Sequence, residues 1–267
     1  MRRLLAILRQ RVKVFAEKLF PKATYERRYR LWLKAEPELR LLPVMCRADA
    51  VAVDVGANEG FFSQHLLLIS QKVVAFEPLP QMLSRLRARY ANEMEIVGVV
   101  LSDRSGEGEL RYPQGGYMTA TIAESNLSAL EGGGVVETVS VPMRTLDSYQ
   151  LSNVGFVKID VEGHEEAVLH GGLGTLRREM PNLMIEIEER HAPGSLARIS
   201  DLLRGMGYAG FYLDGRELFP IEQFDPSRNQ VINESKTGRY INNFLFFPHE
   251  RAKAILADAR LYLRRTV

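Results

Sequence analysis

Three polar segments of this chain each follow an apolar run that is typical of a buried strand. The first is Val51-Ala-Val-Asp-Val-Gly-Ala-Asn-Glu-Gly, in which Asp54, Gly56, Asn58 and Gly60 form the pattern D-x-G-x-N-x-G. Glycine permits a sharp turn and a close approach of the backbone to a ligand, and asparagine tolerates positive φ better than most residues. The segment therefore predicts a strand, a tight turn and a helix around a nucleotide-like cofactor.

The second segment, Lys72-Val-Val-Ala-Phe-Glu-Pro, ends a second predicted strand on Glu77. An acid about 20 residues after a glycine turn binds ribose hydroxyls in dinucleotide folds. An NAD-dependent dehydrogenase also has a glycine turn followed by an acid. Its turn, however, has the pattern G-x-G-x-x-G and binds a pyrophosphate. Here Asn58 replaces the second glycine, and Asp54 and Glu59 would repel a pyrophosphate. Acids instead suit a cofactor with an amino-acid end and a sulfonium cation, so the dehydrogenase is the weaker alternative.

The third segment, Phe156-Val-Lys-Ile-Asp-Val-Glu-Gly-His, ends a strand on Asp160 and is followed by Glu162 and His164. Ligands of open α/β sheets bind beyond the carboxyl ends of the strands. We therefore expect these three side chains at the same edge of the sheet as the glycine turn.

Strand-like and helix-like patterns alternate from residue 50 onward, which predicts a largely parallel sheet covered on both faces. The predicted strands are 50–55, 72–76, 95–101, 155–159, 183–187, 208–213 and 243–247. The predicted helices are 60–69, 81–92, 165–178, 195–206 and 249–265. Between 102 and 148 the glycine-rich sequence predicts a hairpin plus a loop, with a further strand at 135–141. The loop either holds a substrate or is disordered.

Composition and charge limit the classes of function. With 267 residues, 46% of them apolar, the chain is expected to form one core, and a net charge of +2 gives no reason to expect a nucleic-acid partner. A single cysteine, Cys46, fits a reducing cytoplasm. We expect neither a signal peptide nor a membrane-spanning helix, because the apolar runs are too short.

Residues 1–47 differ from the rest, with 13 Lys and Arg against 4 Asp and Glu. Apolar residues from Leu4 to Leu19 recur at helical spacing, and a second helix is predicted at 25–35, followed by a connection from Pro37 to Ala48. The first helix either packs against the core or a second subunit, or it lies on an anionic membrane surface. The second alternative would make the protein peripheral at the inner face of the membrane.

Taken together, these segments resemble the FkbM family of S-adenosylmethionine-dependent methyltransferases. The matching motifs are Asp54-Val-Gly-Ala-Asn-Glu-Gly, Phe76-Glu-Pro, Leu101-Ser-Asp, Thr145-Leu-Asp, Lys158-Ile-Asp-Val-Glu-Gly-His-Glu, Pro181 to Glu186 and Asn243-Phe-Leu-Phe-Phe-Pro. The resemblance covers about residues 48–248, between a basic extension at 1–47 and a C-terminal helix at 249–267. It implies a Rossmann-like, seven-stranded, mostly parallel sheet with helices on both faces and the last strand inserted antiparallel.

The resemblance also implies a cofactor, a reaction and site residues. The cofactor would be S-adenosyl-L-methionine, and the reaction O-methylation of a hydroxyl of a sugar, a glycan or a secondary metabolite. Glu77 would bind the ribose, Ser102 and Asp103 would lie at the adenine, and Asp160 and Glu162 would lie next to the methyl group. Four residues would line the methionine end: Asp54, Gly56, Asn58 and Gly60.

An alcohol is a poor nucleophile at neutral pH, so a base near its proton would assist the transfer. The candidate catalytic residues are Asp160, Glu162, His164 and His191, although His164 stands where the family often carries a small residue. Of the acids at 186, 188 and 189, Glu186 is favoured for the site.

A divalent metal bound by Asp160 and Glu162 is an alternative, but we predict no metal. A cofactor-binding scaffold without turnover is a further alternative, and the sequence specifies neither the acceptor nor the oligomeric state.

Overall fold

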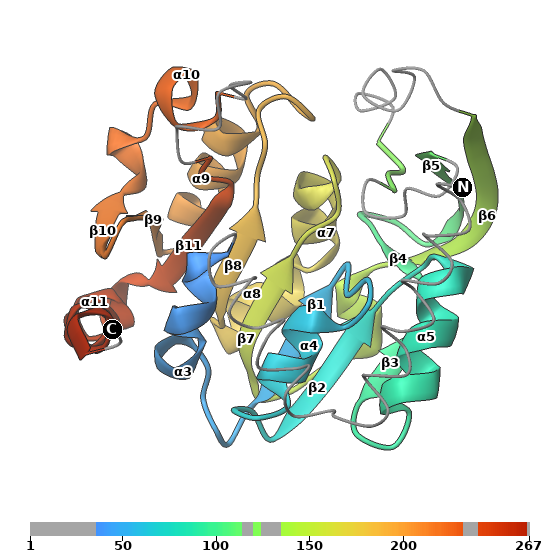
Figure 1. Ribbon diagram of the computed structural model, residues 1–267, viewed down its shortest axis with the longest axis horizontal. Coiled ribbons are helices and arrows are strands. Elements are labelled where there is room, and N and C mark those ends of the chain that lie inside the picture. Colours follow the sequence, from blue (N-terminus) through green and yellow to red (C-terminus); the bar gives the residue numbers. More distant parts are fainter. Residues whose placement is uncertain (1–35, 114–119, 124–134, 232–239, 266–267) are drawn as a thin grey trace, which may run out of the picture. The chain divides into compact units, whose positions relative to one another are not determined.

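The computed structural model describes residues 36–113, 120–123, 135–231 and 240–265 (Figure 1). The chain divides into two compact units, Met1–Arg40 and Leu41–Val267, and the second contains the sheet and the candidate site. The helices predicted at 4–19 and 25–35 lie outside the described residues. The connection predicted from Pro37 to Ala48 is wrong, because the short helices η1 (Pro37–Leu41) and α3 (Leu42–Met45) occupy most of it. Proline is compatible with the first turn of a helix, where Pro37 and Pro43 are found.

The main sheet has eight strands in the order β10-β9-β11-β8-β7-β1-β2-β3. The five strands from β8 to β3 are parallel, whereas β11 is antiparallel to both β8 and β9. The strands are β1 (Val51–Val55), β2 (Lys72–Phe76), β3 (Glu95–Val97), β7 (Val154–Ile159), β8 (Asn182–Glu186), β9 (Tyr208–Asp214), β10 (Glu217–Pro220) and β11 (Asn243–Pro248). The predicted Rossmann-like fold, including the antiparallel insertion of the last strand, is confirmed.

The strand count differs from the expected seven because β10 returns antiparallel along β9 at the edge of the sheet. The two strands are joined at Gly215, which has a φ of 61°. Asp214 pairs with Glu217, so the loop is the two residues Gly215 and Arg216, and glycine at the first loop position is a signal of a tight hairpin.

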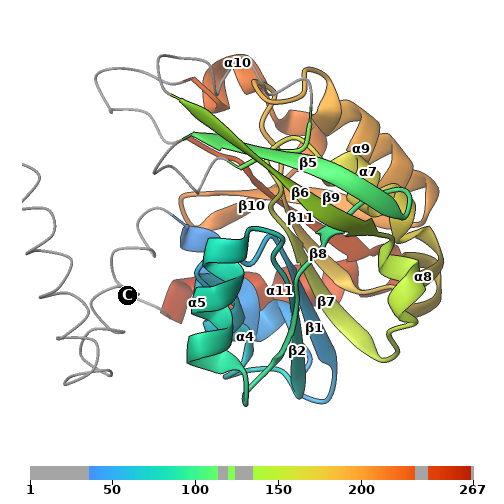
Figure 2. The same cartoon turned by 90° about the vertical axis from the view of Figure 1, so that its right-hand side faces the viewer.

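Helices cover both faces of the sheet, as predicted (Figures 1 and 2). One face carries α3, α4 (Phe61–Leu66), α5 (Pro80–Tyr90) and α11 (His249–Arg265). The other carries α7 (Glu165–Gly171), α8 (Leu173–Glu179) and α9 (Ser195–Gly205). The helix predicted at 165–178 is two helices, because Gly172 interrupts it with non-helical backbone angles. Three shorter helices are η4 (Leu146–Tyr149), η5 (Ile221–Gln223) and α10 (Pro226–Asn229).

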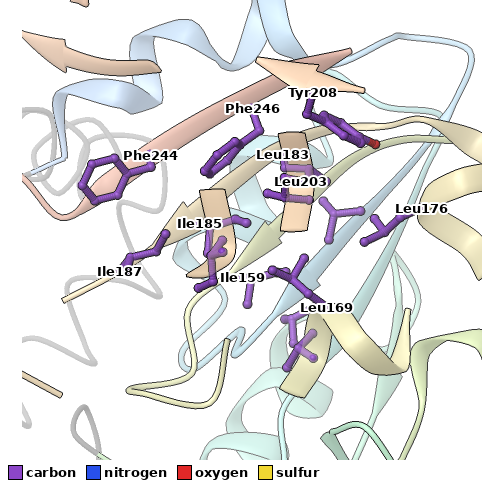
Figure 3. Close-up of a cluster of buried hydrophobic side chains, with 14 of the residues drawn as sticks. Ile159, Leu169, Leu176, Leu183, Ile185, Ile187, Leu203, Tyr208, Phe244 and Phe246 are labelled. Carbon is purple, nitrogen blue, oxygen red and sulfur yellow. The ribbon is translucent and has the colours of Figure 1, made fainter. Parts of the chain in front are cut away.

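The core between the sheet and helices α7, α8 and α9 is formed by aliphatic and aromatic side chains (Figure 3). It includes Ile159, Leu183 and Phe244 from the strands and Leu169 and Leu203 from the helices. All residues of β7 and β11 are buried, which explains their continuous apolar runs, since strands covered on both faces have no solvent-facing side. Among the residues that the structure describes, no helix combines the length and apolar character needed to cross a membrane.

A second sheet contains β4 (Val100–Leu101), β6 (Val136–Arg144) and β5 (Gly106–Pro113), in the order β4-β6-β5. The further strand predicted at 135–141 is found as β6, and it forms the antiparallel pair with β5 itself. The single strand predicted at 95–101 is wrong, since β3 belongs to the main sheet and β4 to the second one. Gly98 lies between them, and a Cβ there would be 2.5 Å from a methyl carbon of Leu83 in α5.

Candidate active site

The glycine turn after β1 lies against the end of β7. Gly56, Asn58 and Gly60 have φ values of 81°, 50° and 81°, all in the left-handed region that favours glycine and asparagine. A Cβ at Gly56 would be 1.8 Å from the carbonyl oxygen of Asp160, so only glycine fits there. The two motifs thus meet at the carboxyl ends of neighbouring strands, as the sequence predicts.

Glu77 follows β2 and is fixed to this turn by the backbone. Its Oε2 accepts a hydrogen bond from the N–H of Asn58 (2.7 Å), and its Oε1 accepts one from the N–H of Leu79 (2.8 Å). The residue is 6% exposed, and burial raises the pKa of its carboxyl to about 7 although the two N–H groups oppose the rise. Each carboxylate oxygen can accept a further hydrogen bond, so the arrangement fits the predicted binding of a diol.

Asp54 lies in the interior beneath the turn, where its Oδ2 accepts a hydrogen bond from the Ser63 hydroxyl (2.5 Å). Burial raises the pKa of Asp54, and the positive charge of Lys158 opposes that rise. The side chain predicted to line the methionine end is therefore 1% exposed and turned towards Ser63.

Lys158 is a site residue that none of the sequence motifs assigned a role. Its ammonium donates to Asp160 Oδ2 (2.7 Å) and lies 4.3 Å from the ring centre of Phe62. The side chain is 2% exposed, and burial alone would lower its pKa, but the charges of Asp160, Glu186 and Asp54 outweigh burial and raise it. A lysine inside the apolar run Phe156 to Ile159 was the available signal, since a buried cation requires a partner.

Glu162 adopts the left-handed conformation (φ 52°), which a non-glycine residue adopts at some cost. Its carbonyl oxygen accepts a hydrogen bond from the buried Thr121 hydroxyl (2.7 Å), and its carboxylate lies 3.0 Å from Nδ1 of His191. Burial first, and then the charges of Asp160, Glu188 and Glu165, raise the pKa of Glu162 to about 8. The structure thus brings together two of the predicted catalytic residues, Glu162 and His191.

The acids after β8 have different partners. Glu188 Oε2 lies 3.8 Å from Nε2 of His191 and accepts hydrogen bonds from the Tyr240 hydroxyl (2.7 Å) and from Arg190. Glu186, which the sequence favoured, accepts from the amide of Asn242 (2.6 Å). The third, at 189, accepts from backbone N–H groups at the start of α9. Glu188 therefore joins the site, and no spacing rule in the sequence distinguished it from its neighbours.

His164 contacts residues on the predicted adenine side. Its Nε2 lies 3.0 Å from the Ser102 hydroxyl, which donates to Asp103 (3.1 Å). Burial lowers the pKa of His164. Because His164 contacts Ser102 and His191 contacts Glu162, the two candidate histidines have different environments.

Within 36–113, 120–123, 135–231 and 240–265, no group of three or more His, Cys, Asp and Glu side chains is arranged to hold a metal ion. Asp160 instead contacts Lys158, and Glu162 contacts His191.

Known proteins with similar sequences include two curated relatives. AMB antimetabolite synthetase AmbE of Pseudomonas aeruginosa is 29% identical over 201 residues, which cover 60% of this chain and 10% of that protein. Hexuronic acid methyltransferase AglP of Haloferax volcanii is 30% identical over 151 residues, which cover 52% of this chain and 56% of that protein. The chain thus spans a small part of the first relative and about half of the second.

Similar solved structures include methyltransferase FkbM from Methylobacillus flagellatus KT, with a TM-score of 0.49 and 16% identity over 75% of this chain and 44% of that one. A precorrin-6y C5,15-methyltransferase from Geobacter metallireducens has a TM-score of 0.42 and 12% identity over 78% of this chain and 86% of that one.

The sequence model of the methyltransferase FkbM domain matches residues 54–209, which is more than half of the chain. This range contains the glycine turn, Glu77, Asp160, Glu162 and His191. The chain therefore belongs to the FkbM methyltransferase family.

Proposed function

We propose that this protein transfers the methyl group of S-adenosylmethionine to a hydroxyl oxygen of a sugar, a glycan or a secondary metabolite. The observation that carries the proposal is the contact between the turn at Gly56 and the end of β7 at Asp160. This contact places a turn suited to a nucleoside cofactor beside carboxylates suited to proton removal and to a sulfonium cation.

The residues present fit S-adenosylmethionine. Glu77 has the remaining acceptor capacity for a ribose diol, and the side chain of Asp160 is 30% exposed beside the turn. Ser102 and Asp103 would bind at the adenine, as the family resemblance implies. A pyrophosphate, as in NAD, fits less well because the carboxylate of Asp160 lies beside the turn.

When bound, S-adenosylmethionine supplies a methyl group that is already activated by the sulfonium. The chain then has to align the acceptor oxygen with the methyl carbon, exclude water and accept the hydroxyl proton. Asp160, Glu162, His164 and His191 are the candidates for proton removal. Asp160 is ion-paired with Lys158, whereas Glu162 faces an imidazole, so Glu162 has the better route for passing a proton on.

A sugar acceptor is supported by AglP, whose name describes a hexuronic acid methyltransferase. We therefore choose a glycoside of a hexuronic acid as the first acceptor to test.

Isothermal titration calorimetry tests the cofactor. S-adenosylmethionine and its demethylated product are expected to bind, and NAD is not. Glu77→Ala should weaken this binding by about tenfold, since a hydrogen bond to a charged group contributes roughly 1.5–3 kcal/mol. The matched control is Glu166→Gln, which removes a carboxylate that pairs with Arg198 on the surface. Preference for NAD would refute the proposal.

Transfer itself is tested with radiolabelled S-adenosylmethionine and the hexuronic acid glycoside, followed by a panel of sugars and small hydroxylated metabolites. Label in an ether linkage supports O-methylation. Cofactor binding without transfer to any acceptor would instead favour a scaffold protein.

For the basic residues 1–47 we retain the proposal of peripheral membrane contact. Each basic residue near an anionic surface contributes about 1 kcal/mol. Retention on anionic vesicles that disappears at high salt, and on deletion of residues 1–22, would support it. No retention at low salt would favour packing against the core or a second subunit.

A further inference from the structure

The carboxylate of Glu162, the imidazole of His191 and the carboxylate of Glu188 lie in series. Nδ1 of His191 is 3.0 Å from Glu162, and Nε2 is 3.8 Å from Glu188. The first distance is short enough for a proton to pass between the two atoms, and the second is a charge contact when the imidazole is protonated. The exposed fractions of the three side chains are 17%, 6% and 5% in the order Glu162, His191, Glu188, so the series runs from a partly open end into the interior.

The inner carboxylate is held in place and kept ionised. Burial would raise the pKa of Glu188, but hydrogen bonds from Arg190 and Tyr240 outweigh burial and lower it. The amide of Asn242 lies 3.4 Å from its other oxygen. A buried carboxylate with this many donors is a fixed negative charge facing the imidazole.

We propose that Glu162 is the base that removes the acceptor proton, that His191 takes over this proton, and that Glu188 is a positioning residue that orients His191 and stabilises its charged form. The proposal rests on the proposed function. It adds the order of the three residues and gives Glu188, which no motif singled out, a role in the reaction.

A lone pair of the acceptor oxygen forms the new bond to the methyl carbon while the carbon–sulfur bond breaks and its electron pair stays on sulfur. The hydroxyl proton moves to the carboxylate of Glu162 and then transiently to Nδ1 of His191, whose pKa lies below that of Glu162. The imidazolium faces Glu188, and the proton returns through Glu162, the more exposed end of the series, to water when the product leaves.

The charged groups around Glu162 and His191 have opposing effects on the pKa values of these two residues. Burial lowers the pKa of His191, Glu188 and Asp160 act to raise it, and Arg190 acts to lower it. The charged groups that act on Glu162 include Asp160, Glu188, Glu165 and Arg190. Removing the charge of Glu188 should therefore lower the pKa of both Glu162 and His191.

The test compares Glu188→Gln, which removes the charge, with Glu188→Asp, which keeps it. Glu166→Gln is the matched control, because it removes a carboxylate that pairs with Arg198 on the surface and leaves Glu188 and its partners unchanged. The first readout is the pH titration of the His191 ring by ¹⁵N NMR in the full chain without any methyl donor. The second is kcat and KM with S-adenosylmethionine and the hexuronic acid glycoside, or the acceptor that the panel identifies.

In Glu188→Gln we expect the His191 titration to move to lower pH and kcat to fall about tenfold with little change in KM. Glu188→Asp should recover most of both losses, and Glu166→Gln should change kcat by less than about threefold. An unchanged His191 titration in a folded Glu188→Gln would overturn the proposal whether or not the protein transfers methyl groups. If Glu188→Gln does not fold, the His191 titration is measured in Glu188→Asp instead. A titration at the same pH as in the wild type would support the proposal, and a titration moved to lower pH despite the retained charge would refute it.

The two proposals fail in different ways. Failure of the wild type to bind S-adenosylmethionine would refute the proposed function, and the NMR shift would then report electrostatic coupling alone. Normal transfer by Glu188→Gln would refute only the role of Glu188.

Discussion

Glu77 and Glu188 are both buried acids at the carboxyl ends of the strands, but they are held by different groups. Glu77 accepts hydrogen bonds from two backbone N–H groups. That of Asn58 belongs to the glycine turn, and that of Leu79 lies two residues further along the chain. Glu188 accepts from the side chains of Tyr240 and Arg190. We call the turn from Asp54 to Gly60 with Glu77 the donor side. Glu162, Glu188, His191 and Tyr240 form the acceptor side.

This difference shows how each side depends on the fold. Backbone groups position Glu77 once β1 and β2 are paired, because the turn geometry then determines where the N–H groups lie. The acceptor side requires side chains from three separate segments to meet. One segment follows β7, one follows β8, and one precedes β11. We therefore expect backbone changes to disrupt the donor side, and side-chain changes without loss of folding to disrupt the acceptor side.

The largest effect is expected from Gly56→Ala. The new Cβ would lie 1.8 Å from the carbonyl oxygen of Asp160, at a φ of 81°. Left-handed strain and overpacking together should lower the free energy of unfolding by roughly 3 kcal/mol or more. Urea unfolding measures the loss. Gly215→Ala is the matched control, because it has a φ of 61° with no atom within 4 Å of the new Cβ, and it should cost only about 1 kcal/mol. Equal losses in the two variants would contradict the close approach at Gly56.

Glu162→Gln tests the acceptor side. We expect kcat to fall about 10²-fold, equivalent to about 2.7 kcal/mol, because the general base is lost. The Kd for S-adenosylmethionine should change little, as Glu162 contacts His191 and not the glycine turn. Steady-state kinetics and calorimetry separate the two quantities. A large change in Kd with kcat preserved would assign Glu162 to the donor side.

The stability of the unliganded protein should depend on pH between about 5 and 8. Burial raises the pKa of Glu77 to about 7, of Glu162 to about 8 and of Glu165 to about 7, each above the ordinary value of 4.5. Over this range the folded state binds more protons than the unfolded state, so the free energy of unfolding should fall as pH rises.

Urea unfolding at several pH values measures this slope. Glu77→Gln removes one of the titrating groups. The decrease in the free energy of unfolding between about pH 5 and 8 should therefore be smaller by roughly 2 kcal/mol in this variant. A slope that is the same in Glu77→Gln and in the wild type would show that the donor-side acid is not protonated on folding.

The smallest effect is expected from Thr121→Val, which removes the hydroxyl that donates to the carbonyl of Glu162 (2.7 Å). The partly buried carbonyl loses this donor and the N–H of Ala123 loses an acceptor, so the free energy of unfolding should fall by about 1 kcal/mol and kcat by a few-fold. Thr138→Val makes the same change at an exposed position of β6 and should affect neither. An effect on stability without any change of kcat would show that the conformation of Glu162 does not depend on Thr121.

Most of the main sheet followed from the alternation of apolar runs and helical spacing. The segments at 72–76 and 249–265 agree with β2 and α11 to the residue. The failures have local causes. Gly98 divides one apolar run between two sheets, and Asp214-Gly215 turns β9 back into β10. Both are glycine positions where an apolar pattern continues while the chain changes direction.

The donor side was determined by the sequence itself. Glycine and asparagine in D-x-G-x-N-x-G specify a backbone conformation, and an acid at the end of the next strand must lie beside it when the two strands pair in parallel. Spacing along the chain was enough, because the contacts join the ends of adjacent elements.

The acceptor side was decided only by the tertiary structure. Glu162, Glu188 and Tyr240 have no fixed spacing, and their contacts arise because β8 lies between β7 and β11 in the sheet. Which of Glu186, Glu188 and the acid at 189 would face His191 depended on the path of the chain after β8, where strand periodicity ends. Side-chain hydrogen bonds between distant segments depend on how those segments pack. The spacing of residues along a single sequence does not show which of these side chains will meet.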